Sequence, residues 1–487
     1  MKQKDFIYNL ILLIILNLLI KPFWVFGIDA GVQNSVGASQ YGLYAAVFNF
    51  TFLFNMLLDM GITNFNNRNI AQHTQLLHKH LSGILTLKIL LGPVYILAVF
   101  AIALLIGYGE LQLKLLGWIA FNQFLNSFIL YLRSNISGCL MFKTDSFLSI
   151  LDRSLVILFC GILLWGNVTD TAFQIEWFVY CQTAAYFISA CIALMIVLRK
   201  GRVVRLSWNY TFFKMILKKS FPFALLYFLM AFYNRIDSVM IERLLPDTIA
   251  SYETGIYASA FRWLDALVMI SYLFSVILLP LFSKMMKQKE DVVPIIKSSF
   301  SLLFVFSITA TILLICYRIP VLDLIYTDHI EESAAVFRFL IPCIIPISFT
   351  YIFGTLLTAN GNMKLLNITS LAGIGVNLLV NFIMIPHLHA VGAAIASLAT
   401  QSVIAIIQIV LVSKALKFSL RVLPYWRGLL YIILLIVSTL LISHYLQINE
   451  LLSLVIAGGV AILLALFTGL LPIGSIKKLV RRSESGL

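Results

Sequence analysis

Long apolar stretches alternate with short polar connections along almost the whole chain. A stretch of about 20 apolar residues can cross a hydrocarbon core of roughly 30 Å as a helix, and about fourteen stretches reach that length. The predicted spans are 6–28, 41–63, 82–108, 115–137, 146–166, 172–198, 220–243, 256–282, 296–317, 335–358, 365–386, 390–413, 427–446 and 450–473. The pattern therefore predicts an all-α polytopic membrane protein.

The basic residues fall heavily on every second connection between these spans. One set of connections carries Lys2, Lys4, Arg68, Lys79, Lys143, the cluster from Arg199 to Lys219, Lys284, Lys287, Lys289, Lys297, Lys364, Lys414, Lys417, Arg421, Arg427 and the stretch from Lys477 to Arg482. The other set carries little beyond Lys114, Arg243, Arg318 and Arg338. Lys and Arg are enriched in cytoplasmic loops. The distribution predicts that both termini are cytoplasmic.

Composition agrees with a membrane protein. The chain is 61% hydrophobic and only 11% charged, with a mean hydropathy of +0.97, which is too little polar surface for a soluble globule. The predicted cytoplasmic loops account for the net charge of +14, because anionic lipid attracts them. No nucleic-acid partner is expected. The six cysteines lie in or beside apolar stretches without a C-x-x-C pair, so we interpret them as buried apolar side chains.

Two basic stretches divide the predicted helices into groups, because 199–219 follows the sixth span and 414–427 follows the twelfth. We expect two six-helix bundles around a central cavity, then a helix pair and a cytoplasmic tail. The predicted boundaries are 1–200, 218–414, 425–473 and 474–487.

A short internal echo supports this division. The second span begins Tyr41-Gly42-Leu43-Tyr44-Ala45, and the eighth begins Thr254-Gly255-Ile256-Tyr257-Ala258. Six spans per half is an even number, so both halves enter the membrane in the same orientation. Transporters use such repeats to surround a central site. Chance recurrence in an apolar chain is the alternative.

Charged residues at membrane depth are the candidate functional residues. Inserting a charged side chain at the centre of a membrane helix costs about 2.5–3.5 kcal/mol, so each of them needs a partner, a water-filled cavity or the interface. Most of the cations lack a carboxylate on the same helix face, which predicts an unneutralised cationic cavity and an anionic substrate. Arginine suits phosphate because its fork can bind two oxygens. The candidates are Lys21, Arg133, Arg235 and Arg262 for substrate binding, and Asp59, Asp237 and Asp265 for orienting those cations or for ion coupling.

The alternative is that these charges form buried salt bridges and helix–helix hydrogen bonds. That interpretation is favoured for Asp152, Arg153 and Asp265. Arg262 and Asp265 are three residues apart on one helix, so they can pair directly.

Motifs for covalent chemistry are missing. The sequence holds no G-x-x-x-x-G-K-[ST] loop, no D-x-D pair, no G-x-S-x-G elbow and no H-E-x-x-H helix. Its histidines have no companions at metal-ligand spacing, so no metal or other cofactor is expected. These observations predict a transporter and not an enzyme, and leave a proton or sodium gradient open as the coupling source.

Several segments resemble the polysaccharide (O-antigen-type) flippases of the multidrug/oligosaccharidyl-lipid/polysaccharide (MOP) exporter superfamily. They are Val36 to Tyr44, Leu58-Asp59-Met60-Gly61-Ile62, Asn67-Arg68-Asn69-Ile70-Ala71, Ala359 to Lys364, Asn377, Asn381, Ile385-Pro386 and Gly392 to Ala396. Their order and spacing cover nearly the whole chain.

The resemblance implies two six-helix bundles facing a cavity that opens alternately to each side of the bacterial inner membrane. It also implies an undecaprenyl-pyrophosphate-linked oligosaccharide as substrate, moved to the outer leaflet for surface polysaccharide assembly. Membrane lipids and other polysaccharide assembly proteins are the further partners it suggests. A flippase for a cell-wall lipid precursor, a drug exporter, and a membrane glycan polymerase or ligase remain as alternatives.

Overall fold

The computed structural model describes residues 19–72, 76–139, 141–166, 168–201, 206–415, 424–445 and 449–471. Every regular element within these ranges is helical, as the apolar pattern predicts. Contacts between residues divide the chain into two units, Met1–Ala258 and Ser259–Leu487, and each unit is described by itself. The predicted tail, 474–487, and most of the predicted first span lie outside the described residues.

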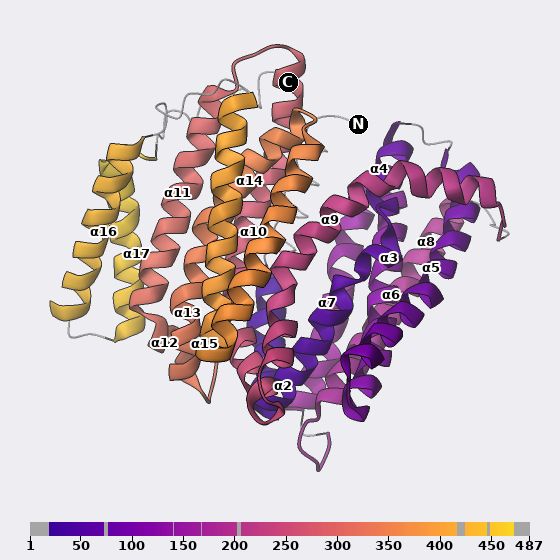
Figure 1. Ribbon diagram of the computed structural model, residues 1–487, viewed down its shortest axis with the longest axis horizontal. Helices are drawn as coiled ribbons and strands as arrows, with labels where there is room; N and C mark the ends of the chain where they lie inside the picture. Colours follow the sequence, from indigo (N-terminus) through magenta and orange to yellow (C-terminus); the bar gives the residue numbers. More distant parts are fainter. Residues whose placement is uncertain are drawn as a thin grey trace. The chain divides into compact units, whose positions relative to one another are not determined.

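Unit 1 is a bundle of helices that run in alternating directions, shown in indigo to magenta in Figure 1. Its elements are η1 (Phe23–Asp29, a π-helix), α2 (Ala30–Leu53), α3 (Asn55–Asp59), α4 (Ile62–Gln72), α5 (Leu76–Ile106), α6 (Glu110–Gly138), α7 (Phe142–Trp165), α8 (Ile175–Gly201), α9 (Tyr210–Leu244) and the start of α10 (Asp247–Lys287). Helix α6 packs against α4 and α8, and α2 packs against α9.

Helix α2 contains the predicted turn between the first two spans. Gly37 has a φ of +82° and a ψ of 163°, which breaks the helix. A residue with a Cβ avoids this positive φ, whereas glycine adopts it without steric cost. The turn therefore lies where the sequence pattern places it.

The two echoing segments cross each other inside unit 1. A Cβ added to Gly42 would lie 1.7 Å from the Ser251 carbonyl oxygen, and one added to Gly255 would lie 2.0 Å from the Ala38 carbonyl oxygen. The Gln33 Nε2 donates a hydrogen bond of 3.1 Å to the Gly255 carbonyl at the same crossing. The glycine in each segment is what allows α2 and α10 to approach backbone to backbone.

Unit 2 holds the remainder of α10 and the helices that follow. They are α11 (Val293–Cys316), α12 (Arg318–Asp323), α13 (Ile330–Leu340), the 3-10 turn η2 (Ile341–Cys343), α14 (Ile344–Ala359), α15 (Met363–Ala415), α16 (Tyr425–Tyr445) and α17 (Glu450–Phe467). The predicted extra helix pair corresponds to α16 and α17, which pack against α11. A hydrogen bond of 2.5 Å joins Thr309 of α11 and Tyr431 of α16.

The described residues include 11 helices that are long and apolar enough to cross a membrane. One of them, α15, has 53 residues and is interrupted at His389, with φ 51° and ψ −131°. This break separates the predicted spans 365–386 and 390–413. The chain is therefore a multi-pass membrane protein, as the sequence predicts.

The contact boundary between the units lies within α10, whereas the predicted boundary between bundles lies near residues 200–218. The crossing at Gly42 and Gly255 explains why α9 and the start of α10 cluster with unit 1. The division into two six-helix bundles stays a prediction.

Candidate functional site

Five of the seven candidate residues lie in unit 1 and two lie in unit 2. Asp59 occupies a break in a membrane helix, Lys21 and Arg133 belong to one charged cluster, and Arg235 and Asp237 share α9. Arg262 and Asp265 lie on the part of α10 that belongs to unit 2.

Asp59 is the last residue of α3, where the helix is interrupted. Met60 and Gly61 both have positive φ values, 46° and 74°, and α4 begins at Ile62. The Asp59 carboxylate accepts two hydrogen bonds from Thr63, one from the backbone N–H at 3.3 Å and one from the hydroxyl. The carboxylate thus caps the first turn of α4, whose N–H groups have no partner within the helix.

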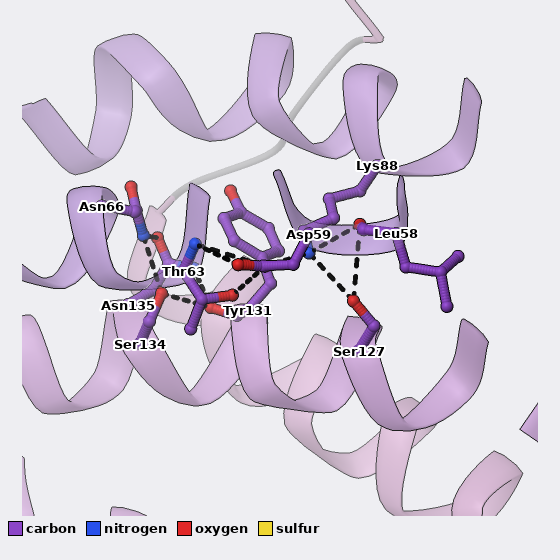
Figure 2. Close-up of polar contacts among 9 residues, drawn as sticks. All are labelled: Leu58, Asp59, Thr63, Asn66, Lys88, Ser127, Tyr131, Ser134 and Asn135. Atoms are coloured by element: carbon purple, nitrogen blue, oxygen red, sulfur yellow. Dashed lines mark hydrogen bonds and ion pairs between the residues drawn. The ribbon is translucent and has the colours of Figure 1, made fainter. Parts of the chain in front are cut away.

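Lys88 of α5 is hydrogen-bonded to the end of α3 at this break. Its Nζ donates to the Asp59 Oδ1 at 2.5 Å, to the Leu58 carbonyl oxygen at 3.1 Å and to the Ser127 Oγ at 3.0 Å. Figure 2 shows the ammonium group between these three acceptors. The Lys88 side chain is 2% exposed and the Asp59 side chain 28%. All three ammonium protons are therefore used, and a carbonyl at the end of α3 gains a donor.

Lys88 was not among the candidate residues that the sequence pattern pointed to. It lies alone in the apolar run Leu85-Thr86-Leu87-Lys88-Ile89 of a predicted span. A lone cation in such a run is itself a signal, since a charge at membrane depth needs a partner. The sequence alone does not say that the partner is Asp59, which is 29 residues earlier.

A hydrogen-bonded layer continues from this pair along α4 and α6. The Asn66 Nδ2 donates to the Ser134 Oγ at 2.9 Å and to the Asn135 Oδ1 at 3.1 Å, as Figure 2 shows. The Asn135 amide in turn donates to the Tyr131 carbonyl at 2.8 Å. These contacts fix α4 against α6, so the polar groups of this layer act in helix packing.

A second charged cluster contains Lys21 and Arg133. Arg133 donates from Nε to the Asp145 Oδ1 of α7 at 2.8 Å, and both side chains are mostly buried. The expectation that Arg133 is unneutralised is therefore wrong. The prediction considered only carboxylates on the same helix face as Arg133, whereas the neutralising carboxylate comes from a neighbouring helix.

Arg153 of α7 belongs to the same cluster. Its guanidinium lies 4.3 Å from the centre of the Trp24 ring and donates from NH1 to the Tyr186 hydroxyl at 3.0 Å. Its Nε lies 3.8 Å from the Asp152 carboxylate. Lys21 interacts electrostatically with Arg153, Arg133 and Asp152.

The five residues Lys21, Arg133, Arg153, Asp145 and Asp152 have a net formal charge of +1, and the buried Asp29 interacts electrostatically with Tyr186, which contacts Arg153. The structure thus joins two predicted substrate-binding cations to Arg153, for which the sequence favoured a structural role. The aromatic faces of Trp24 and Tyr186 add cation–π stabilisation that is stronger where water is excluded.

Arg235 and Asp237 lie two residues apart on α9. The Arg235 guanidinium is 5.5 Å from the centre of the Phe52 ring on α2. Asp237 is 1% exposed, and its Oδ2 accepts a hydrogen bond of 2.8 Å from the Tyr257 hydroxyl of α10. Tyr257 belongs to the echoing segment from Thr254 to Ala258, so this segment provides a hydrogen-bond donor to Asp237.

Arg262 is buried in unit 2 and connects α10 to the segment before α13. It donates from NH1 to the Tyr326 hydroxyl at 2.8 Å, and that hydroxyl donates to the Ser259 carbonyl at 3.2 Å. Asp265, three residues along the helix, is half-buried. The direct pairing of Arg262 with Asp265 stays a prediction.

Metal ligands do not gather in the described residues, where no group of three or more His, Cys, Asp and Glu side chains could hold an ion. The charged candidates of unit 1 form ion pairs, cap a helix or contact aromatic rings, and Arg262 of unit 2 is hydrogen-bonded to Tyr326.

A sequence profile described as "Polysaccharide biosynthesis protein" matches residues 7–286, which is more than half of the chain. The chain belongs to this family. The matched region includes the helix break at Asp59, the Lys88 pair and the Lys21–Arg133–Arg153 cluster. None of the curated protein sequences compared with the chain matches it.

Solved transporter structures share the fold of this family member. The lipid II flippase MurJ in an inward closed conformation aligns with a TM-score of 0.72 at 13% identity, over 94% of this chain and 98% of that one. An inward-facing multidrug resistance MATE family transporter of the MOP superfamily aligns with a TM-score of 0.62 at 14% identity, over 81% and 96%. The Vibrio cholerae MATE transporter VcmN in the bent form aligns with a TM-score of 0.56 at 12% identity, over 85% and 97%.

Proposed function

We propose that this chain is an alternating-access flippase. Its proposed substrate is an undecaprenyl-pyrophosphate-linked oligosaccharide, moved from the cytoplasmic to the outer leaflet of the bacterial inner membrane for surface polysaccharide assembly. The observation that carries the proposal is the family match over residues 7–286, within a fold that aligns with transporters over most of the chain. The basic connections between spans support cytoplasmic termini.

The charged clusters of unit 1 support an anionic substrate. Lys21, Arg133 and Arg153 outnumber the carboxylates of their cluster, and arginine can present two donors to a phosphate. Arg235 and Arg262 are proposed as further binding cations. Asp59, Asp237 and Asp265 are proposed to orient these groups or to couple transport to a proton or sodium gradient.

Fold similarity to the lipid II flippase favours a second candidate, transport of a cell-wall lipid precursor. Both candidates move a lipid whose headgroup begins with phosphate, so the charged clusters do not distinguish them. A drug exporter fits less well, because exported drugs are mostly cations and the cluster is cationic.

The deciding experiment uses a strain that lacks the gene and vesicles that contain the purified protein. The proposal predicts loss of surface glycan in the strain and flipping of the oligosaccharide-linked lipid in the vesicles. If the strain keeps its surface glycan and the vesicles flip only the cell-wall precursor, the second candidate replaces the first. Polymer formation from isolated repeat units would instead indicate an enzyme.

A further inference from the structure

Helix α9 begins before the span that the sequence predicts. That span covers residues 220–243, whereas the helix starts at Tyr210. Figure 1 shows the start of α9 running across the ends of other helices in unit 1 before it bends along them. The Asn209 side chain caps this start by accepting a hydrogen bond of 3.0 Å from the Phe212 N–H. The first turns of α9 therefore lie across the ends of neighbouring helices of unit 1.

One side of this segment is buried against α5. Phe213 and Ile216 are 6% and 0% exposed and belong to a core cluster that includes Leu81 and Ile84. A Cβ added to Gly83 would lie 2.6 Å from the Phe212 ring, so the two helices approach closely. The predicted span 82–108 begins one residue before Gly83, so this contact lies near the predicted membrane boundary.

Exposed aromatic and basic side chains lie at the start of this segment and along it, and the Trp208 ring also contacts the Phe213 ring, with centres 6.0 Å apart. Trp208 and Tyr210 are 73% and 72% exposed. Lys214, Lys218 and Lys219 are exposed on the same segment. We call these five residues the basic aromatic face. Tryptophan and tyrosine favour the membrane–water interface, and lysine there attracts anionic headgroups.

Local carboxylates do not balance these charges. The chain has no Asp or Glu between Glu176 and Asp237, a range that also contains Arg199 and Lys200 at the end of α8. Within the part of the chain that the structure describes, none of the three lysines forms an ion pair. The face therefore presents positive charge at the end of unit 1 that the loop bias assigns to the cytoplasm.

We propose that the basic aromatic face is a binding surface for the anionic phospholipids of the adjoining leaflet. Headgroup phosphates contact Lys214, Lys218 and Lys219, and the Trp208 and Tyr210 rings lie at the level of the lipid carbonyls. The same helix continues into the membrane and carries Arg235 and Asp237, so lipid contact fixes the depth at which α9 enters. This inference goes beyond the proposed function and does not depend on it.

The test measures binding of phosphatidylglycerol and phosphatidylcholine with matched acyl chains to the purified full chain, by native mass spectrometry. The variant replaces Lys214, Lys218 and Lys219 together by Gln, which keeps the side-chain length. The matched control replaces Lys284, Lys287 and Lys297 by Gln. These lysines are also exposed and lie on the same predicted side of the membrane, but in unit 2.

We expect the triple variant to bind phosphatidylglycerol on the order of 100-fold more weakly, at roughly fivefold for each lysine. Phosphatidylcholine binding should change less than about twofold, and the control variant should lose less phosphatidylglycerol affinity than the triple variant, because Glu290 and Asp291 lie between its lysines. A 1 M salt wash should weaken phosphatidylglycerol binding to the unaltered protein. At this ionic strength the Debye length is roughly 3 Å, so the attraction between exposed lysines and headgroups is screened. The salt measurement needs no variant, so a variant that fails to fold does not remove the test.

Equal loss in the triple and control variants would overturn the proposal, because binding would then follow net charge alone. Salt-insensitive binding, or equal affinity for both lipids, would overturn it as well. If the triple variant binds phosphatidylglycerol normally but loses undecaprenyl phosphate, the face serves the carrier lipid and the proposal as stated fails. None of these measurements requires transport, so they stand apart from the test of the proposed function.

Discussion

Replacing Lys88 by Met should strongly destabilise unit 1. The change removes the ammonium that contacts Asp59, Leu58 and Ser127, while Met keeps most of the buried volume of the Lys88 side chain. Asp59 would keep only its contacts with Thr63.

The magnitude follows from the burial of the pair. Lys88 is 2% exposed and Asp59 28%, so water cannot fully replace the lost cation. Removing one partner of a buried pair costs about 3–5 kcal/mol, because the other charge is left without compensation. Total stabilities are about 5–15 kcal/mol, and a loss of this size should also lower the protein level in the membrane.

The assay is the free energy of unfolding of purified variants, from denaturant titration in mixed micelles. Lys114→Met is the matched control, because its Nζ is 4.0 Å from the Glu176 carboxylate and its side chain is 59% exposed. Exposed pairs contribute about 0–1 kcal/mol, so this variant should stay close to the unaltered protein.

A double variant separates charge pairing from other losses. Asp59→Asn with Lys88→Met removes both charges, and its cost should be at least about 1–2 kcal/mol less than the sum of the single costs. The reasoning is refuted if Lys88→Met behaves like Lys114→Met, or if the two single costs simply add in the double variant.

Three further predictions follow from the fold and the clusters. An impermeant thiol reagent applied outside cells should label a cysteine placed at Asp328 and miss one at Lys214; the reverse labelling would overturn the predicted orientation. Gly42→Ala should lower the free energy of unfolding by about 1–3 kcal/mol or more, because its Cβ meets the Ser251 carbonyl at 1.7 Å. Gly31→Ala, whose nearest neighbour would be 3.7 Å away, should be nearly neutral, and equal effects would disprove the close crossing. Arg133→Ala should abolish surface glycan and also lower the membrane level, because it leaves the mostly buried Asp145 without its partner, while Arg133→Lys keeps partial export at a normal level; full export by the Ala variant would exclude Arg133 from substrate binding.

The sequence by itself determined the class of fold, the approximate number of spans and several turns. Hydrophobic runs of spanning length are a local property of the chain. The turn at Gly37 and the Asn360-Gly361 turn between α14 and α15 also come from local residue preferences, and Gly361 has a φ of +79°. The family resemblance, which the sequence profile match confirms, rests on such local motifs as well.

Only the tertiary structure decided which charges are partners. Arg133 is paired with Asp145, and Asp59 is paired with Lys88, which the sequence analysis did not single out. The close approach of Gly42 to the start of α10 is also visible only in the tertiary structure, and it explains why α9 belongs to unit 1. The physical reason is that spacing along one helix determines which residues share a face, whereas charge neutralisation depends on distances between helices. Those distances depend on packing across the whole unit, which no single stretch of sequence specifies.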